Sequence, residues 1–100
     1  MPDPISTWPH KVTEPKDPDA VLDYLIDWSD WLEVGETITS SEWEMAGDAL
    51  IVTDTNTDTT TTVWVSGGSA TFKVTNAITT SSVPVARQDN RTLVIKVKDK

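Results

Sequence analysis

The chain has 100 residues, a formal net charge of −8 and no cysteine. A chain of this length forms one small domain, whose modest core excludes a large buried ligand cavity. The acidic charge argues against a nucleic-acid partner, because phosphate binding needs lysine and arginine. Without cysteine there is no disulfide framework and no thiolate metal site, which suits assembly in a reducing cytoplasm.

No apolar run approaches the roughly 20 residues that a membrane helix needs, and MPDPISTWPHK lacks the apolar stretch of a secretory signal. We therefore expect neither a membrane partner nor secretion. The charge is uneven, with a formal net of −10 in residues 1–50 and +2 in residues 51–100. An uneven solvated surface explains this most simply. The alternatives are an acidic face toward a basic partner and head-to-tail contact between copies.

The first nineteen residues predict an extended arm, because five of the six prolines lie there: Pro2, Pro4, Pro9, Pro15 and Pro18. Proline fixes φ, lacks an N–H and favours extended geometry in the residue before it. We therefore divide the chain into an arm, 1–19, and a domain, 20–100. The arm also carries Ile5 and Trp8, which are costly to leave in water. With Pro9 they are candidate anchors on the domain itself or on a neighbouring subunit.

Residues 17–35 fit two patterns. Asp17 as N-cap, Pro18 at the first helical position and Gly35 past the end favour a helix, with a mainly apolar stripe between them. Alternation favours a strand, with one face formed by Leu22, Tyr24, Ile26 and Trp28. Pattern alone slightly favours the helix.

Beyond Gly35 the sequence predicts short strands. In Thr37–Met45 the apolar residues change parity between Ile38 and Trp43, which predicts a bulge near Ser40–Ser41. The other predicted strands are Leu50–Thr53, Thr60–Ser66, Ala70–Thr79 and Thr92–Lys98, separated by Gly, Asn and Asp turns. Short alternating strands at this spacing are typical of an antiparallel sandwich or barrel.

The threonine-rich stretch TDTNTDTTTTVWVSGG, residues 53–68, reads as a polar loop, a strand and a glycine turn. Asp54, Asn56 and Asp58 match the first three ligand positions of an EF-hand loop. The match fails afterwards, because Thr59 stands at the glycine position and Val65 at the glutamate position. Calcium is a minor alternative here, and we predict no metal site and no cofactor.

Catalytic chemistry finds little support. His10 is the only histidine and lies in the proline-rich arm, and there is no G-x-S-x-G motif and no thiol. Five tryptophans allow a carbohydrate-binding alternative, since sugar rings stack on exposed aromatic faces. In so small a domain we assign Trp28, Trp43 and Trp64 to the core. Trp8 and Trp31 are assigned to the surface or an interface, and Trp31 joins the candidate docking residues.

Five segments in order carry a resemblance over roughly residues 16–98: KDPDAVLDYLIDWSDWL, GETITSSEW, TDTTTTVWVSGG, FKVTNAITTS and NRTLVIKVKDK. They resemble the small tailed-phage virion proteins labelled phage fiber–tail adaptor proteins, which are similar to immunoglobulin-like domains. Two positions depart from the family pattern. Phe72 stands where a tyrosine is typical, and Ser82–Arg87 replaces a Gly-Arg turn, so the last hairpin should differ in shape.

The resemblance implies an all-β, immunoglobulin-like antiparallel β-sandwich of about six to eight short strands with the arm in front. It makes residues 20–31 the first strand, against the helical pattern. It also implies a non-enzymatic structural protein of a tailed-phage particle, assembled in the bacterial host cytoplasm. Its partners would be connector, tail or fiber proteins and copies of itself in a symmetric ring. Capsid decoration and glycan binding are the alternative functions.

Overall fold

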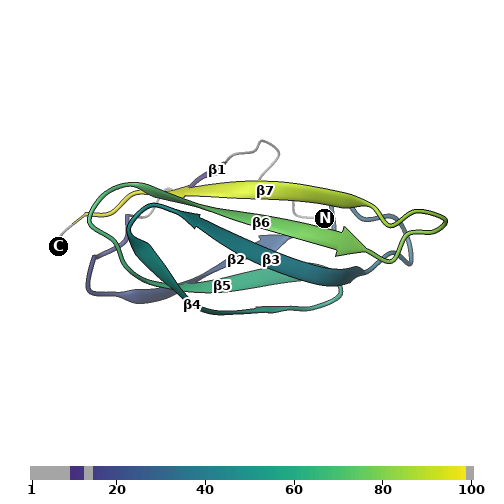
Figure 1. Cartoon of the computed structure of the whole chain (residues 1–100), viewed down its shortest axis with the longest axis horizontal. Coiled ribbons are helices and arrows are strands. Elements are labelled where there is room, and N and C mark those ends of the chain that lie inside the picture. Colours follow the sequence, from purple (N-terminus) through teal and green to yellow (C-terminus); the bar gives the residue numbers. More distant parts are fainter. Residues whose placement is uncertain (1–9, 13–14, 99–100) are drawn as a thin grey trace.

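The computed structural model describes residues 10–12 and 15–98, and those residues form seven strands and no helix (Figure 1). The strands are β1 (His10–Lys11), β2 (Val21–Asp27), β3 (Ile38–Ala46), β4 (Ala49–Asn56), β5 (Thr60–Gly67), β6 (Phe72–Thr80) and β7 (Gln88–Ile95). None of the described residues belongs to a helix that could cross a membrane.

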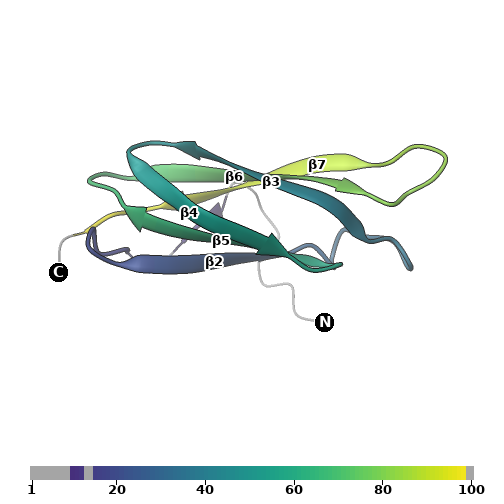
Figure 2. The ribbon, with the colours of Figure 1, turned by 60° about the horizontal axis from the view of Figure 1, so that its bottom comes forward.

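The strands form two sheets packed face to face, one of order β1-β7-β6-β3 and one of order β2-β5-β4 (Figures 1 and 2). Paired strands are antiparallel except β1, which runs parallel to β7. The predicted all-β sandwich is thereby confirmed. The orders β2-β5-β4 and β7-β6-β3 are those of the B-E-D and G-F-C strands of immunoglobulin domains. The immunoglobulin-like assignment itself stays a prediction.

The core lies between the sheets and is built by alternating residues of each strand. On β6 the residues Phe72, Val74, Asn76 and Ile78 are all buried, as the predicted alternation requires. Val63 and Val65 of β5 meet them from the other sheet, with Ile26, Leu93 and Ile95 in the same cluster. Each fully buried aliphatic side chain contributes about 1.5–3 kcal/mol relative to an exposed one.

Residues 21–27 form a strand, so the helical preference of the pattern was wrong. The strand that the resemblance implied for residues 20–31 is confirmed over 21–27, while residues 28–31 lie in the connection that follows. All seven residues pair with β5, from Val21 beside Ser66 to Asp27 beside Thr60. The ladder and the burial of Ile26 stabilise the strand more than local helix propensity stabilises a helix. The inward face is the predicted one, with Tyr24 partly buried, and Trp28 just beyond the strand is fully buried.

The predicted kink in β3 is confirmed, because its pairing with β6 shifts register between Ile38 and Ser40. The extra residue changes which side chains face the core, so that Ile38 and Trp43 both point inward despite their parity. A second shift lies in β4 between Ile51 and Thr53. The sequence had not indicated that one.

The threonine-rich stretch is a hairpin. The hydroxyl of Thr57 accepts hydrogen bonds from the backbone N–H groups of Thr59 and Thr60, which closes the turn between β4 and β5. β5 ends at Gly67, where φ is 76° and the turn to β6 begins. The assignment of Trp64 to the core was wrong. Val63 and Val65 point inward, so Trp64 points outward and is 38% exposed.

A buried amide joins the two sheets. The Oδ1 atom of Asn76 accepts hydrogen bonds from Trp28 Nε1 at 3.0 Å and from Thr61 Oγ1 at 2.7 Å. Its Nδ2 atom donates to Ser41 Oγ and to the Glu42 carbonyl. All four hydrogen-bonding positions of the amide are therefore used, which removes the cost of burying it.

The described part of the predicted arm runs along the edge of β7. His10 lies beside Leu93 and Lys11 beside Val94, and Lys16 forms a further parallel bridge with Val97. Lys16 is fully buried, and its ammonium donates to the carbonyls of Asp17 and Gly67. Burial lowers the pKa of Lys16 from its ordinary value. The division at residues 19 and 20 stays a prediction.

Candidate docking surfaces

The candidate functional features of the described residues lie on the surface of the sandwich. In residues 10–12 and 15–98, no three His, Cys, Asp or Glu side chains are grouped to hold a metal ion. The lowered pKa values of Glu36 and Asp48 follow from hydrogen bonds that fix turns. Asp48 is held by Ser69, its partner in the neighbouring turn.

Three connections meet at one end of the sandwich, which we call the loop end. They are residues 28–37 between β2 and β3, residues 57–59 between β4 and β5, and residues 81–87 between β6 and β7. Backbone hydrogen bonds join them, from Ile38 to the Asp58 carbonyl and from Ser81 to the Thr37 carbonyl. In Figure 1 the β6–β7 hairpin extends furthest at this end.

Arg87 locks two of these loops together. Its Nε and Nη2 atoms donate to the two carboxylate oxygens of Glu36, at 2.9 and 2.5 Å, and its guanidinium lies over the ring of Trp31. Glu36 also accepts from Thr80 Oγ1 and from the backbone N–H of Glu33. These hydrogen bonds, first among them those from Arg87, lower the pKa of Glu36 to about 2.

Arg91, four residues after Arg87 and within β7, makes the same kinds of contact. Its guanidinium carbon lies 4.2 Å from the ring centre of Trp28, and both terminal nitrogens donate to Asp30 at 3.1 Å. The Trp28 and Trp31 rings meet edge to face, 5.6 Å apart. Planar guanidinium groups stack on aromatic rings and bind carboxylates in a bidentate manner, so the 28–37 loop is held by Arg87 and by Arg91.

The loop end presents aliphatic side chains directly to water. Val34 at the tip of residues 28–37 is fully exposed, and Val83 and Val85 on the β6–β7 loop are 85% and 73% exposed. The peptide bond between Val83 and Pro84 is cis. The β6–β7 loop is seven residues long, so the predicted difference in the last hairpin falls at this exposed tip.

A second apolar surface lies on the outer face of the β2-β5-β4 sheet, which we call the Trp64 face. In the register, Trp64 stands beside Asp23 of β2 and Thr53 of β4. Diagonal neighbours in such a sheet lie about 7–8 Å away, within reach of an indole. The exposed apolar residues around Trp64 on these strands are Val21, Leu25, Leu50 and Val52.

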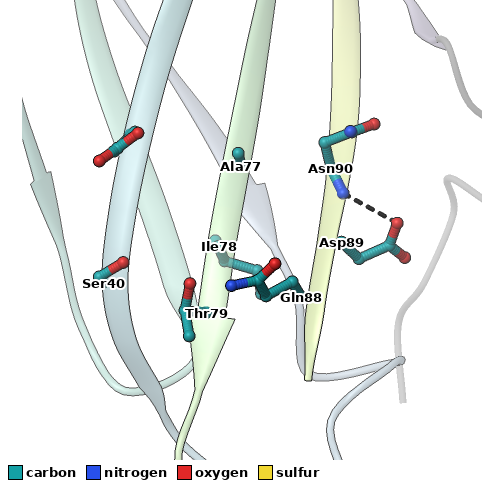
Figure 3. A pocket seen from close by; sticks show the side chains of 8 residues that line it. Ser40, Ala77, Ile78, Thr79, Gln88, Asp89 and Asn90 are labelled. Atoms are coloured by element: carbon teal, nitrogen blue, oxygen red, sulfur yellow. Dashed lines mark hydrogen bonds between the residues drawn. The ribbon is translucent and has the colours of Figure 1, made fainter. Parts of the chain in front are cut away.

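The opposite face of the sandwich carries a shallow polar groove, shown in Figure 3. Ala77 of β6 forms its floor, because its small side chain lies between the longer ones of β3 and β7. The lining residues are Ser40, Glu42, Ala77, Ile78, Thr79, Gln88, Asp89 and Asn90. They include no histidine, lysine or arginine, so the groove contains no paired acid and base.

The predicted site residues separate into two groups. Ile5, Trp8 and Pro9 lie outside the described residues, so their role as anchors stays a prediction. Trp31 is at the loop end and partly buried, with Arg87 on one face and Trp28 at its edge. Its contacts within the domain hold the 28–37 loop, and its role in docking also stays a prediction.

The partial EF-hand motif falls on a strand and a turn. Asp54 and Asn56 belong to β4, and Asn56 donates to the carbonyl of Thr57. Asp58 lies in the turn between β4 and β5. The sequence did not indicate the pairing of Arg87 with Glu36 or of Arg91 with Asp30, because 51 and 61 residues separate the partners.

The architecture is a β-sandwich that exposes apolar side chains on its loop end and on the Trp64 face, features that are common in protein-binding modules. The family described as podophage GP4 fiber-tail adaptor protein gp77 matches residues 16–96. The chain therefore belongs to this phage fiber-tail adaptor family and has a structural role in the phage tail. No curated protein matches the chain.

Proposed function

We propose that the protein is a non-enzymatic adaptor that docks onto neck or tail connector proteins and attaches fibers or other virion proteins. The family match supports a component of the virion that binds tail and fiber proteins. The observation that carries the finer proposal is the loop end, where two loops are locked by Arg87 and expose aliphatic side chains. Assembly takes place in the bacterial host cytoplasm.

The arm supplies a second contact in this proposal, with copies of the chain arranged in a symmetric ring. Ile5, Trp8 and Pro9 anchor the arm on the neighbouring copy, since buried aromatic residues carry much of the binding energy of interfaces. A Trp8→Ala chain should fold, with an unchanged circular dichroism spectrum, but should enter particles poorly. Normal incorporation of Trp8→Ala into particles would remove the arm from the proposal.

Capsid decoration is the alternative location, and a map of the whole particle with this domain located distinguishes the two. Glycan binding is the alternative function, and it needs several exposed, coplanar tryptophan rings. Of the four described tryptophans, Trp28 is buried, Trp43 is partly buried against the core, Trp31 is stacked against Arg87, and Trp64 is 38% exposed. Sugar-dependent quenching of tryptophan fluorescence would favour the glycan alternative, and unchanged fluorescence is expected.

A further inference from the structure

The loop end combines three properties that together specify what it binds. It exposes aliphatic side chains, it is held rigid, and it is acidic. We propose that the loop end inserts Val34, Val83 and Val85 into an apolar depression rimmed by lysine and arginine on another virion protein. This inference rests on the proposed adaptor function and names the chemistry of one partner.

The aliphatic tips are the anchors. Val34 is fully exposed, and Val83 and Val85 are 85% and 73% exposed. Each of these apolar side chains lies on a connection between strands. Loops on rigid scaffolds commonly carry binding residues. The two loops are neighbours, since Thr37 N donates to Ser81 Oγ at 3.0 Å and Ser81 N donates to the Thr37 carbonyl. The bases of the two loops are therefore adjacent, and the three valines lie at the same end of the sandwich.

The loops are ordered before any partner arrives. Arg87 on the second loop donates to Glu36 and to the Trp31 carbonyl on the first, and Thr80 donates to the same Glu36 carboxylate. Ordering a flexible loop on binding costs free energy, and a loop already held in position avoids that cost. These hydrogen bonds between the loops thus favour tight binding through a small surface.

The charge of the loop end selects the partner. The loop end, taken together with the strand residues that border it, Asp27 of β2 and residues 88–91 of β7, contains six carboxylates against the two guanidinium groups of Arg87 and Arg91. The carboxylates are Asp27, Asp30, Glu33, Glu36, Asp58 and Asp89. Both arginines are engaged with carboxylates of the same end. The formal net charge of −4 attracts a basic rim and repels phosphate groups, which excludes nucleic acid and anionic lipid.

A second copy of the chain fits this surface poorly. Two loop ends repel each other because both are acidic. The opposite end of the sandwich, residues 16–20, 46–49, 67–73 and 96–98, has four lysines, of which Lys16 is buried, against three aspartates. It is nearly neutral and supplies no basic rim. The partner is therefore a different protein.

The test adds purified full-length chain to phage particles assembled without it and measures the amount that co-sediments. Val34→Ser with Val85→Ser should lower binding about tenfold or more, as loss of interface anchors does. Ala70→Ser is the control, because Ala70 is exposed at the opposite end of the sandwich. Equal loss in the control, or no loss in the double variant, overturns the proposal.

The charge is tested separately with Glu33→Lys and Asp89→Lys, against the control Glu44→Lys on β3. The two loop-end variants should bind more weakly than the control, and binding of the unchanged chain should fall between 50 and 500 mM salt, a range over which the screening length drops from about 14 to about 4 Å. Binding that rises with salt, or is equal in all three variants, contradicts a basic rim. If the unchanged chain does not bind particles, the adaptor proposal itself fails. If the unchanged chain binds and none of the loop-end variants binds more weakly, only the loop-end assignment is overturned.

Discussion

The guanidinium carbon of Arg87 lies 4.0 Å from the ring centre of Trp31, while the same group is hydrogen-bonded to the carboxylate of Glu36. One side chain therefore joins the β6–β7 loop to the β2–β3 loop by stacking and by ion pairing together. Because Arg87 is partly exposed, its ion pair contributes little to the stability of the domain. Its main effect is to fix the positions of the two loops.

Arg87→Lys should loosen the loop end without unfolding the domain. Lysine keeps the charge but has neither the planar fork that matches Glu36 nor the flat surface that stacks on Trp31. Hydrogen exchange of the Leu32 and Glu33 amides should accelerate, because these amides lie in the loop that Arg87 holds. Exchange in β6 should be unchanged, and equal acceleration there would show global destabilisation instead.

Glu36→Gln should lower the free energy of unfolding at neutral pH. The difference in this free energy between the variant and the unchanged chain should become smaller in acid. The folded state holds the pKa of Glu36 at about 2, below its ordinary value of 4.5. A depressed carboxyl pKa stabilises the fold fully above pH 4.5 and loses that contribution as pH falls toward 2. Urea midpoints of both chains at pH 6, 4 and 3 measure the difference. A constant difference would contradict this account.

Asn76→Leu should destabilise the sandwich by at least about 2 kcal/mol, because Trp28 Nε1 and the Thr61 hydroxyl lose their shared acceptor in the core. Asn90→Ala is the matched control, because Asn90 is exposed on β7, and it should change stability by less than about 0.5 kcal/mol. Chemical denaturation gives both values. A nearly neutral Asn76→Leu would show that the core repacks around the missing amide.

Two tryptophan substitutions separate the core from the surface. Trp28→Ala should cost about 3–5 kcal/mol, since the side chain is fully buried. Trp64→Thr should leave stability within about 0.5 kcal/mol, because threonine suits an exposed strand position. A large loss on Trp64→Thr would indicate that the indole packs over Val21 and Leu25 more closely than its exposure suggests.

Gly47→Ala should be more damaging than Gly35→Ala. Both glycines have positive φ, 143° and 80°, but a Cβ at Gly47 would lie 2.5 Å from Phe72 Cβ, while a Cβ at Gly35 meets nothing within 4 Å. Backbone strain alone costs about 1–3 kcal/mol, and the clash adds to it at Gly47. Equal thermal midpoints for the two variants would show that Phe72 moves aside freely.

Much of the sandwich could be predicted from alternation alone. Phe72, Val74 and Ile78 all face the core as their spacing indicates, and the change of parity in Thr37–Met45 correctly predicted the kink at Ser40. These signals are local, because adjacent side chains of a strand point to opposite faces. The helical prediction for residues 17–35 was wrong because the strand is stabilised by pairing with β5. That pairing partner lies outside the window from which the pattern was taken.

Trp64 shows where composition misleads. In a chain with few apolar residues, a large aromatic residue is expected in the core. On β5, however, Val63 and Val65 occupy the inward face. Because successive side chains of a strand point to opposite faces, Trp64 points outward. The pairing of Arg87 with Glu36 could not be predicted, because it joins the β6–β7 loop to the connection between the two sheets, 51 residues away. Its position depends on the register of two sheets, which no local pattern specifies.

The parallel pairing of β1 with β7 has a mechanical consequence. Val12 N donates to the Val94 carbonyl, Lys16 N to the Lys96 carbonyl and Lys98 N to the Lys16 carbonyl. Because the two strands run side by side in the same direction, tension applied in opposite senses at residues 10 and 98 loads these bonds in shear. They must then break together rather than one after another. This geometry therefore resists being pulled open at those two residues.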